Sequence, residues 1–201
     1  MKHKTLLFLL LAMLASTTLQ AYDAKIDGIY YNFSGSEATV TYQNYSNHKY
    51  YSDYTGAVVI PEAVTYNGKT YSVTTIGDNA FFDCADLTSI AIPKSIKTIR
   101  NAFKNCTGLT SVHITDLPAW CNISFPALTF SYDNYQLLTY PQPLYFAHQL
   151  YLNGQEVKDL VIPDGVTSIG KYAFYGCSGF TSVTIPNSVT NIDNTAFSGC
   201  I

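Results

Sequence analysis

Apolar residues recur in a fixed order over most of the chain, with polar residues between them. The stretch from Val166 to Pro186, VTSIGKYAFYGCSGFTSVTIP, is nearly repeated between Val73 and Pro93 as VTTIGDNAFFDCADLTSIAIP. Aligning the copies yields the pattern L-x-x-I-x-I-P-x-x-x-I-x-x-I-x-x-x-A-F-x-x-C. Such a pattern is typical of a structural unit that is stacked several times, because every copy contributes the same buried face.

The spacing between equivalent isoleucines indicates the architecture. Ile92 and Ile114 are 22 residues apart, and Ile162 and Ile185 are 23 apart, which matches one coil of a leucine-rich-repeat solenoid. One coil cannot bury enough apolar surface to fold alone, so neighbouring coils must stack. We therefore predict a β-rich α/β leucine-rich-repeat solenoid with short parallel strands and a short helical or 3₁₀ turn in each coil.

Each part of the coil has its own expected conformation. The alternation in L-x-x-I-x-I predicts a strand with Ile90 and Ile92 facing inward and Ser89 and Ala91 facing outward. The following proline, Pro93 in this copy, ends the strand because proline cannot donate a backbone hydrogen bond. We expect I-x-x-I to form a second extended piece and A-F-x-x-C to form the compact turn.

The residues before the repeats, 22–72, are rich in tyrosine and do not show the pattern. They contain two predicted hairpins. Residues 28–43 surround a Ser-Gly-Ser turn, and residues 58–73 surround Asn67-Gly68, a pair that favours a type I′ turn. A solenoid needs its open end covered. We expect 22–72 to form an N-terminal β-hairpin cap and 73–201 to form the solenoid.

The pattern breaks between Ile114 and Ile162, over 48 residues or about two periods. We expect one divergent coil over 116–156, and we favour an embellished structural coil over a dedicated binding insert. The array ends at Ile201 without a C-terminal cap. Two interpretations stay open: end-to-end self-association covers this last coil or, as we favour, the chain is a fragment of a longer array.

Residues 1–21 have the features of a secretory signal peptide. Lys2 and Lys4 precede an apolar run from Leu6 to Leu14, and small residues lead to Ala21. The run is shorter than the roughly 20 residues that a membrane anchor needs, so we expect no membrane span. Removing the two lysines takes the net charge from −3 to −5. We expect a secreted or cell-surface protein that does not bind nucleic acid.

The five cysteines are expected to be small core residues. Four of them occupy the same place in the A-F-x-x-C turn of successive copies, which favours burial over disulfide crosslinks. No C-x-x-C pair is present, so a zinc site has no support. The cysteines are Cys84, Cys106, Cys121, Cys177 and Cys200.

The repeats resemble those of the BspA-like leucine-rich-repeat family of bacterial proteins. The family pattern is close to IPxSVTSIGxxAFxxCxxLTSVTIP, and the stretch IPDGVTSIGKYAFYGCSGFTSVTIPNSVTNI follows it almost residue by residue. The resemblance covers Val58 to Ile201 apart from the divergent coil. It implies an exported or surface-displayed protein that mediates adhesion to host matrix or plasma proteins or to other cells, and it implies no catalytic residue.

No catalytic group is expected from the residues themselves. Ser111, His113 and Asp116 lie close in sequence and are of the types that form a catalytic triad. Ser111 and His113, however, occupy outward strand positions that hold serine, alanine or threonine in other copies. His48 and His148 are isolated and lack metal-ligand spacing. We predict that the protein is not an enzyme and needs no metal or cofactor.

Two surfaces are candidates for binding a partner. The outward strand positions form a predicted concave face whose small side chains suit broad protein contact, with solvated repeat positions that bind nothing as the alternative. Its residues are Ser89, Ala91, Ser111, His113, Asp159, Val161, Ser182 and Thr184.

The second candidate is a tyrosine-rich patch of the cap, since amphipathic rings serve protein and glycan interfaces; packing within the cap is the favoured alternative. Its residues are Tyr42, Tyr45, Tyr50, Tyr51 and Tyr54.

These features predict a non-enzymatic secreted or cell-surface protein that mediates protein–protein interaction or adhesion. Two alternatives remain. One is a glycan-binding accessory protein that uses the tyrosine-rich patch, and the other is a structural repeat fragment of a longer surface protein.

Overall fold

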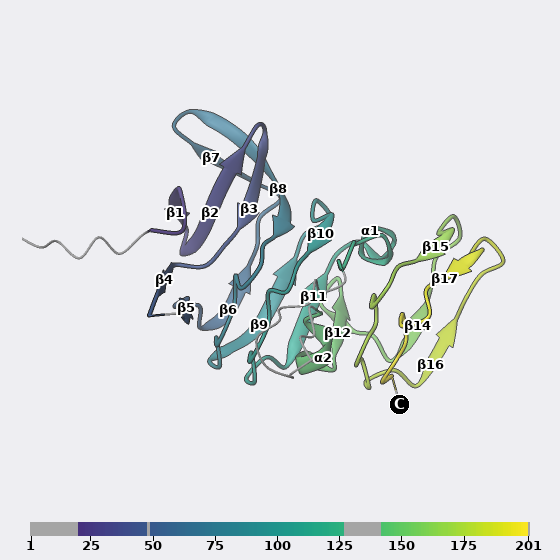
Figure 1. Cartoon of the computed structure of the whole chain (residues 1–201). Coiled ribbons are helices and arrows are strands. Elements are labelled where there is room, and N and C mark those ends of the chain that lie inside the picture. Colours follow the sequence, from purple (N-terminus) through teal and green to yellow (C-terminus); the bar gives the residue numbers. More distant parts are fainter. Residues whose placement is uncertain (1–19, 48, 127–141, 201) are drawn as a thin grey trace, which may run out of the picture.

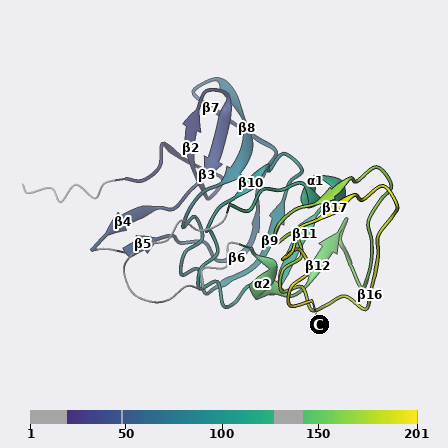
Figure 2. The same ribbon diagram turned by 45° about the vertical axis from the view of Figure 1, so that its right-hand side comes forward.

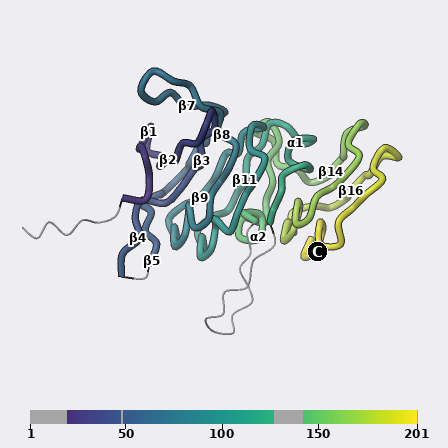
Figure 3. The backbone as a smooth tube through the Cα atoms, turned by 45° about the horizontal axis from the view of Figure 1, so that its top comes forward, coloured from purple at the N-terminus to yellow at the C-terminus, as the bar shows by residue number. Residues whose placement is uncertain are grey.

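The computed structural model describes residues 20–47, 49–126 and 142–200. The predicted signal peptide lies outside the described residues except for its last two, Gln20 and Ala21, and so does Ile201. The chain advances from its N-terminal hairpins toward the last repeat as a series of coils stacked side by side (Figure 1). The smoothed backbone shows these coils as a row of parallel loops (Figure 3).

The L-x-x-I-x-I segments form the first row of strands, as predicted. Four parallel strands follow one another, and one antiparallel strand lies at the edge of the sheet. They are β6 (Gly56–Val59), β9 (Leu87–Ile92), β11 (Ser111–Ile114), β12 (Leu150–Leu152) and the antiparallel β13 (Gln155–Glu156). Beyond them, β14 (Asp159–Val161) pairs in parallel with β16 (Ser182–Thr184) as a separate sheet.

The I-x-x-I segments form a second row, again with parallel pairing between coils. Its members are β3 (Glu37–Val40), β8 (Lys69–Ile76) and β10 (Thr98–Ile99), followed later by β15 (Ser168–Ile169) and β17 (Asn191–Ile192). Antiparallel strands join this row or pair with each other near the N-terminus. They are β1 (Ala24–Ile26), β2 (Ile29–Ser34), β7 (Ala63–Tyr66) and the separate pair β4 (Asn44–Ser46) and β5 (Lys49–Tyr51).

The predicted hairpin turns are confirmed, but one strand has a different partner. Asn67 and Gly68 have φ angles of 50° and 74°, as a type I′ turn requires, and they join β7 to β8. The prediction that Val58 and Val59 belong to the same hairpin is wrong, because β6 pairs in parallel with β9. The segment Val58–Pro61, VVIP, matches the strand end IAIP of the next coil, so it stacks on that strand.

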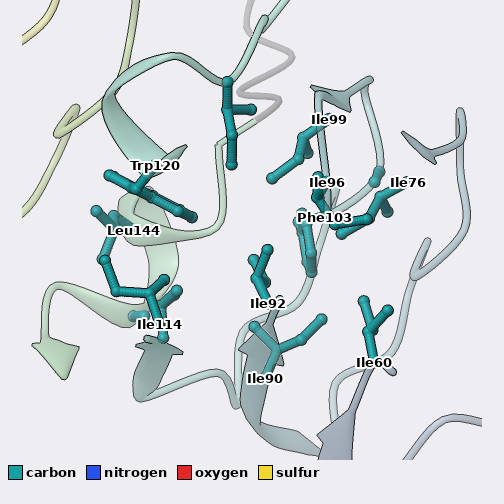
Figure 4. Close-up of a cluster of buried hydrophobic side chains, with 14 of the residues drawn as sticks. Ile60, Ile76, Ile90, Ile92, Ile96, Ile99, Phe103, Ile114, Trp120 and Leu144 are labelled. Atoms are coloured by element: carbon teal, nitrogen blue, oxygen red, sulfur yellow. The ribbon is translucent and has the colours of Figure 1, made fainter. Parts of the chain in front are cut away.

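The core lies between the two rows. Ile90 and Ile92 point inward from β9 toward Ile96, Ile99 and Phe103 of the same coil (Figure 4), and all five side chains are buried. Their neighbours in β9 alternate outward, as predicted. The phenylalanines of the A-F-x-x-C turns stack from coil to coil, with 4.9 Å between the ring centroids in the first pair of copies.

The A-F-x-x-C segments form turns with hydrogen bonds between residues three apart, which agrees with the 3₁₀ alternative of the prediction and not with an α-helical turn. In the first copy, Phe82 N donates to Asn79 O (3.1 Å) and Cys84 N to Phe81 O (3.2 Å). Asn79 and Asp83 adopt positive φ angles of 58° and 57°, which interrupt any continuous helix. Both helices of the described residues, α1 (Leu117–Cys121) and α2 (Leu144–Ala147), lie between β11 and β12.

The cysteines are free, and four of the five are fully buried, which confirms their prediction as core residues. Each thiol in the repeated turn has a backbone acceptor. Cys106 Sγ donates to Phe81 O at 3.0 Å, and Cys200 Sγ donates to Phe174 O at 2.9 Å. The thiol therefore links each turn to the preceding coil.

Between β11 and β12, the helices α1 and α2 and several side-chain hydrogen bonds take the place of part of the regular coil. Ser124 forms a parallel bridge with Thr98, which continues the second row, and α2 lies beside β11 and β12 (Figures 1 and 2). Trp120 Nε1 donates to Ala173 O at 2.9 Å. Gln142 Nε2 donates to the carbonyls of Tyr172 and Ala173 at 2.9 and 2.8 Å. Side chains thus connect this segment to the next repeat.

Candidate functional site

The outer face of the first row presents side chains in register. Parallel pairing places Ser111 level with Ser89, and His113 level with Ala91. Strand alternation directs all four outward, because the intervening apolar residues are fully buried in the core. These four predicted residues therefore lie together on one half-exposed surface.

Two residues that the sequence reasoning missed extend this surface. Val59 lies level with Ala91 on one side, and Tyr151 lies level with His113 on the other. Val59 is 69% exposed. The match of VVIP to IAIP could have identified Val59 as an outward strand residue, and the alternation in Leu150–Leu152 could have identified Tyr151 in the same way. We call the row Val59, Ala91, His113 and Tyr151, together with Ser89 and Ser111, the outer strand face.

His113 lies between Ala91 and Tyr151 in the outer strand face. Its ring stacks on that of Tyr151, with a centroid separation of 4.6 Å and an interplanar angle of 22°. Its Nε2 lies 3.1 Å from Ser111 Oγ, within hydrogen-bonding distance. The imidazole is thereby held between a hydroxyl and an aromatic ring. Such a surface offers apolar area together with hydrogen-bonding groups.

Asp116 does not complete a triad with Ser111 and His113. Its carboxylate caps helix α1, where Oδ1 accepts a hydrogen bond from Ala119 N at 2.8 Å. An aspartate at this position satisfies a backbone amide that has no partner within the helix. The proximity of the three residues in the sequence therefore reflects a strand followed by a helix cap.

The other four predicted residues lie on a separate sheet. Asp159 and Val161 of β14 are level with Ser182 and Thr184 of β16, and all four are exposed. The antiparallel strand β13 ends the first sheet before β14 begins. The predicted surface is thus divided in two. Hydrogen bonds from Ser182 (2.6 Å) and Thr181 (2.9 Å) lower the pKa of the Asp159 carboxyl.

Three of the predicted tyrosines form an aromatic cluster near β4 and β5. The Tyr50 ring lies 4.9 Å from Tyr42 and 4.8 Å from Tyr45, and burial raises its pKa. Tyr45 and Tyr51 are 43% and 42% exposed.

Tyr54 does not belong to this surface. It is buried, and its hydroxyl accepts from Tyr30 N and donates to Thr41 O, each at 3.0 Å. Its ring packs 4.6 Å from Phe81. Tyr54 therefore belongs to the hydrophobic core, beside the first A-F-x-x-C turn.

A groove of about 410 Å³ runs beside β6, between this strand and the turn that joins β1 to β2. Lys25 and Asp53 form an ion pair across it at 3.1 Å, and the Tyr30 hydroxyl donates to Asp53 at 2.9 Å. Desolvation raises the pKa of Asp53, but hydrogen bonds from Tyr30 and Lys25 outweigh it and lower the pKa overall. The carboxylate therefore stays ionised near neutral pH.

Within the described ranges, no group of three or more His, Cys, Asp or Glu side chains is placed to hold a metal ion. In the same ranges, the structure contains no helix of the length and apolarity that a membrane crossing requires.

Stacked coils with two rows of parallel strands and an uncovered outer face define a leucine-rich-repeat protein. Proteins of this class typically use such extended surfaces for binding and not for catalysis. The family model for the BspA type leucine rich repeat region matches residues 62–149 and 145–201, and the chain belongs to this family.

Solved structures of other bacterial leucine-rich-repeat proteins are similar. One from Bacteroides ovatus is 28% identical, with a TM-score of 0.46, over 89% of this chain and 45% of that one. A leucine rich cell surface protein from Faecalibacterium prausnitzii is 23% identical, with a TM-score of 0.46, over 88% of this chain and 52% of that one. The chain thus spans about half the length of each. No curated protein matches the sequence.

Proposed function

We propose that this chain is an exported, non-enzymatic protein of the bacterial surface or surroundings that binds another protein through the outer strand face. The observation that carries the proposal is the register across β6, β9, β11 and β12, which joins four coils into one continuous surface. Its small side chains keep the surface flat, and the His113–Tyr151 stack provides an aromatic area. Aromatic residues are enriched among the few residues that dominate binding energy at protein interfaces.

The proposed architecture is a solenoid over 73–201 with 22–72 as an N-terminal cap. Two arrangements support it. Strands β1 and β2 lie antiparallel beside β3, at the first end of the second row. The aromatic side chains of Tyr30 and Tyr31 are buried there and contribute to the hydrophobic core.

A binding screen tests the function. The chain from residue 22 to 201 is immobilised and offered purified host matrix proteins, plasma proteins and whole bacterial cells. We expect at least one protein to bind, and we expect His113→Ala combined with Tyr151→Ala to weaken binding at least tenfold. Lys97→Ala is the matched control, because Lys97 is exposed on the second row. Equal binding by the double variant and the unmodified chain would refute the proposed surface.

A second candidate function, glycan binding, is favoured by the aromatic cluster of Tyr42, Tyr45 and Tyr50 together with exposed Tyr51. Exposed tyrosine rings can stack on sugar faces. A polysaccharide array that detects binding, with loss in a Tyr50→Ala, Tyr51→Ala double variant, would support this function. Silence in both screens would favour a structural repeat without a ligand of its own.

A further inference from the structure

Strand β6 leaves one edge of the first sheet open. It is the last strand of its sheet in the described part of the chain, with β9 as its neighbour on the other side. Gly56 N donates to Asp86 O at 2.8 Å, and Ile60 N donates to Ala91 O at 3.0 Å. Successive backbone amides of a strand point to opposite sides, so the amide and carbonyl groups of Ala57 and Val59 point away from β9. These groups form an unpaired edge.

At the corresponding end of the second row, two further strands are added to β3. There, β2 pairs with β3 along four residue pairs, and β1 pairs with β2. The N-terminal strands therefore cover one row and not the other. Ala57 and Val59 are exposed, whereas Ala91 in the next coil is half-buried. At this end of the stack, β6 therefore lacks the neighbour that β3 has in β2.

The groove described above lies along this edge and has the composition of a peptide site. Its apolar part is made by Ile29 and Val58, which are 5% and 9% exposed. Alternate side chains of an added strand would face them. A strand added beside β6 needs no rearrangement of β9, because the unpaired amide and carbonyl groups of Ala57 and Val59 point away from β9 and toward the groove.

The charge of the groove favours a basic partner. Its ionisable side chains are Lys25, Asp27 and Asp53. Lys25 pairs with Asp53, which leaves the exposed carboxylate of Asp27 as the excess charge on the wall. The chain as a whole also carries a net charge of −3. A lysine or arginine on the partner is the complementary group.

We propose that the open edge of β6 binds an extended polypeptide segment of another protein, which adds a strand to the first sheet and places a basic residue against Asp27. Strand addition at an exposed edge is an established mode of peptide recognition, in which main-chain hydrogen bonds supply affinity and side-chain pockets supply specificity. This site is separate from the outer strand face.

Amide hydrogen exchange tests the proposal directly. The probe is the acetylated, amidated peptide KTVTVTK, added to ¹⁵N-labelled chain from residue 22 to 201. We expect the amides of Ala57 and Val59 to exchange rapidly in the free protein and at least tenfold more slowly with saturating peptide. The peptide KTVPVTK, in which proline removes a donor, should bind more weakly. This measurement needs no protein variant, so it does not depend on a variant folding.

Two variants of Val59 then distinguish the contribution of its backbone amide to peptide binding from that of its side chain. Val59→Pro removes the outward amide and should abolish binding, while Val59→Thr retains it and should bind within about threefold of the unmodified chain. Circular dichroism melting confirms that each variant is folded. Asp27→Asn should weaken binding of KTVTVTK more than binding of the neutral peptide STVTVTS.

Three results would overturn the proposal. The first is peptide binding without protection of Ala57 and Val59. The second is protection of these amides already in the free monomer, since the edge would then be covered by the chain itself. The third is protection that rises with protein concentration, which would identify a second copy as the occupant. The His113 and Tyr151 double variant reports on the outer strand face, so either proposal can fail alone.

Discussion

The coil between β9 and β11 and the segment between β11 and β12 both connect neighbouring strands of one sheet, but with different chemistry. In the first, Ile92 is level with Ile114, 22 residues later; in the second, Ile114 is level with Leu152, 38 residues later. The strands are nevertheless parallel and continuous in both cases. The sheet therefore tolerates a large change in the connection, as long as the strand itself can pair.

The difference lies in how the turns are connected to the next coil. In the regular repeats, backbone amides donate to the following coil, as Phe81 N does to Ala102 O (2.9 Å) and Phe174 N to Ala196 O (2.8 Å). In the divergent segment, Trp120 and Gln142 supply side-chain donors to Tyr172 and Ala173. Buried carbonyls require donors, and a side chain can meet this need where the backbone conformation has changed.

The largest expected effect is at Trp120, which is 1% exposed. Trp120→Ala should lower the free energy of unfolding by about 3–5 kcal/mol, measured by urea denaturation, because it creates a cavity. Trp120→Phe should cost less, since Ala173 O keeps its hydrogen bond from Gln142. Phe103→Ala is the matched substitution in a regular coil, with a similar expected loss. A Trp120→Ala loss under about 1 kcal/mol would contradict the structural role of the segment.

Gln142 comes next, because its side chain is fully buried and connected to three backbone groups. It donates to Tyr172 O and Ala173 O, and its Oε1 accepts from Leu144 N. Gln142→Leu should cost about 2–3 kcal/mol, since it leaves buried backbone groups without partners. The exposed Gln149 provides the control: Gln149→Leu should change the free energy of unfolding by less than about 0.5 kcal/mol. Equal losses would show that hydrogen bonding at Gln142 is unimportant.

Because thiols are buried in both the divergent segment and the regular repeats, we expect the protein to lose stability at alkaline pH. Burial raises the pKa of Cys121 and of Cys177 from 9.0 to about 12. Above pH 9 the unfolded thiols ionise while the folded ones keep their protons, so the unfolded state binds fewer protons and stability falls as pH rises toward 12. The slope is about 1.4 kcal/mol per pH unit for each thiol. Cys121→Ala and Cys177→Ala should each remove the contribution of one thiol from the slope of the unfolding free energy against pH. The slope is measured by urea denaturation between pH 8 and 10 in the presence of a reductant. An unchanged slope would contradict burial of that thiol.

The smallest effect is expected from an exposed ion pair between a regular coil and the N-terminal strand β3. Lys97 and Glu37 are 3.8 Å apart, with side chains 74% and 55% exposed. Lys97→Ala should alter the free energy of unfolding by less than about 0.5 kcal/mol, because solvent and salt screen such pairs. A loss comparable to that of Gln142→Leu would show that exposed side chains, and not only buried donors, hold the coils together.

Much of the coil was predictable from its pattern. The inward isoleucines, the strand ends before proline, the Asn-Gly turn and the buried cysteines all follow from local preferences and from alternation. The choice between a helical and a 3₁₀ turn could not be made from the sequence, because the compact A-F-x-x-C segment does not reveal the positive φ angles of Asn79 and Asp83. The conformation of these residues depends on hydrogen bonds to the following coil, such as Asn79 N to Asn101 O at 2.9 Å.

The candidate surfaces were predictable only in part. Strand alternation identified Ser89, Ala91, Ser111 and His113 as outward residues, but it could not show that β13 separates them from β14 and β16. The composition of the tyrosine-rich stretch likewise could not distinguish buried Tyr54 from exposed Tyr45. A tyrosine is compatible with either place, since its ring packs well and its hydroxyl can find a partner.

The repeating coil follows from the order of apolar residues alone, because a buried position must be apolar in every copy and the copies preserve that order. The choice of neighbouring strands, and of the edges and faces that stay uncovered, is made when the whole chain folds. Pairing depends on the position of whole strands in space, and no local pattern records it. Val58 and Val59, which read as part of a hairpin, therefore belong to β6, the edge strand of the first sheet in the described part of the chain.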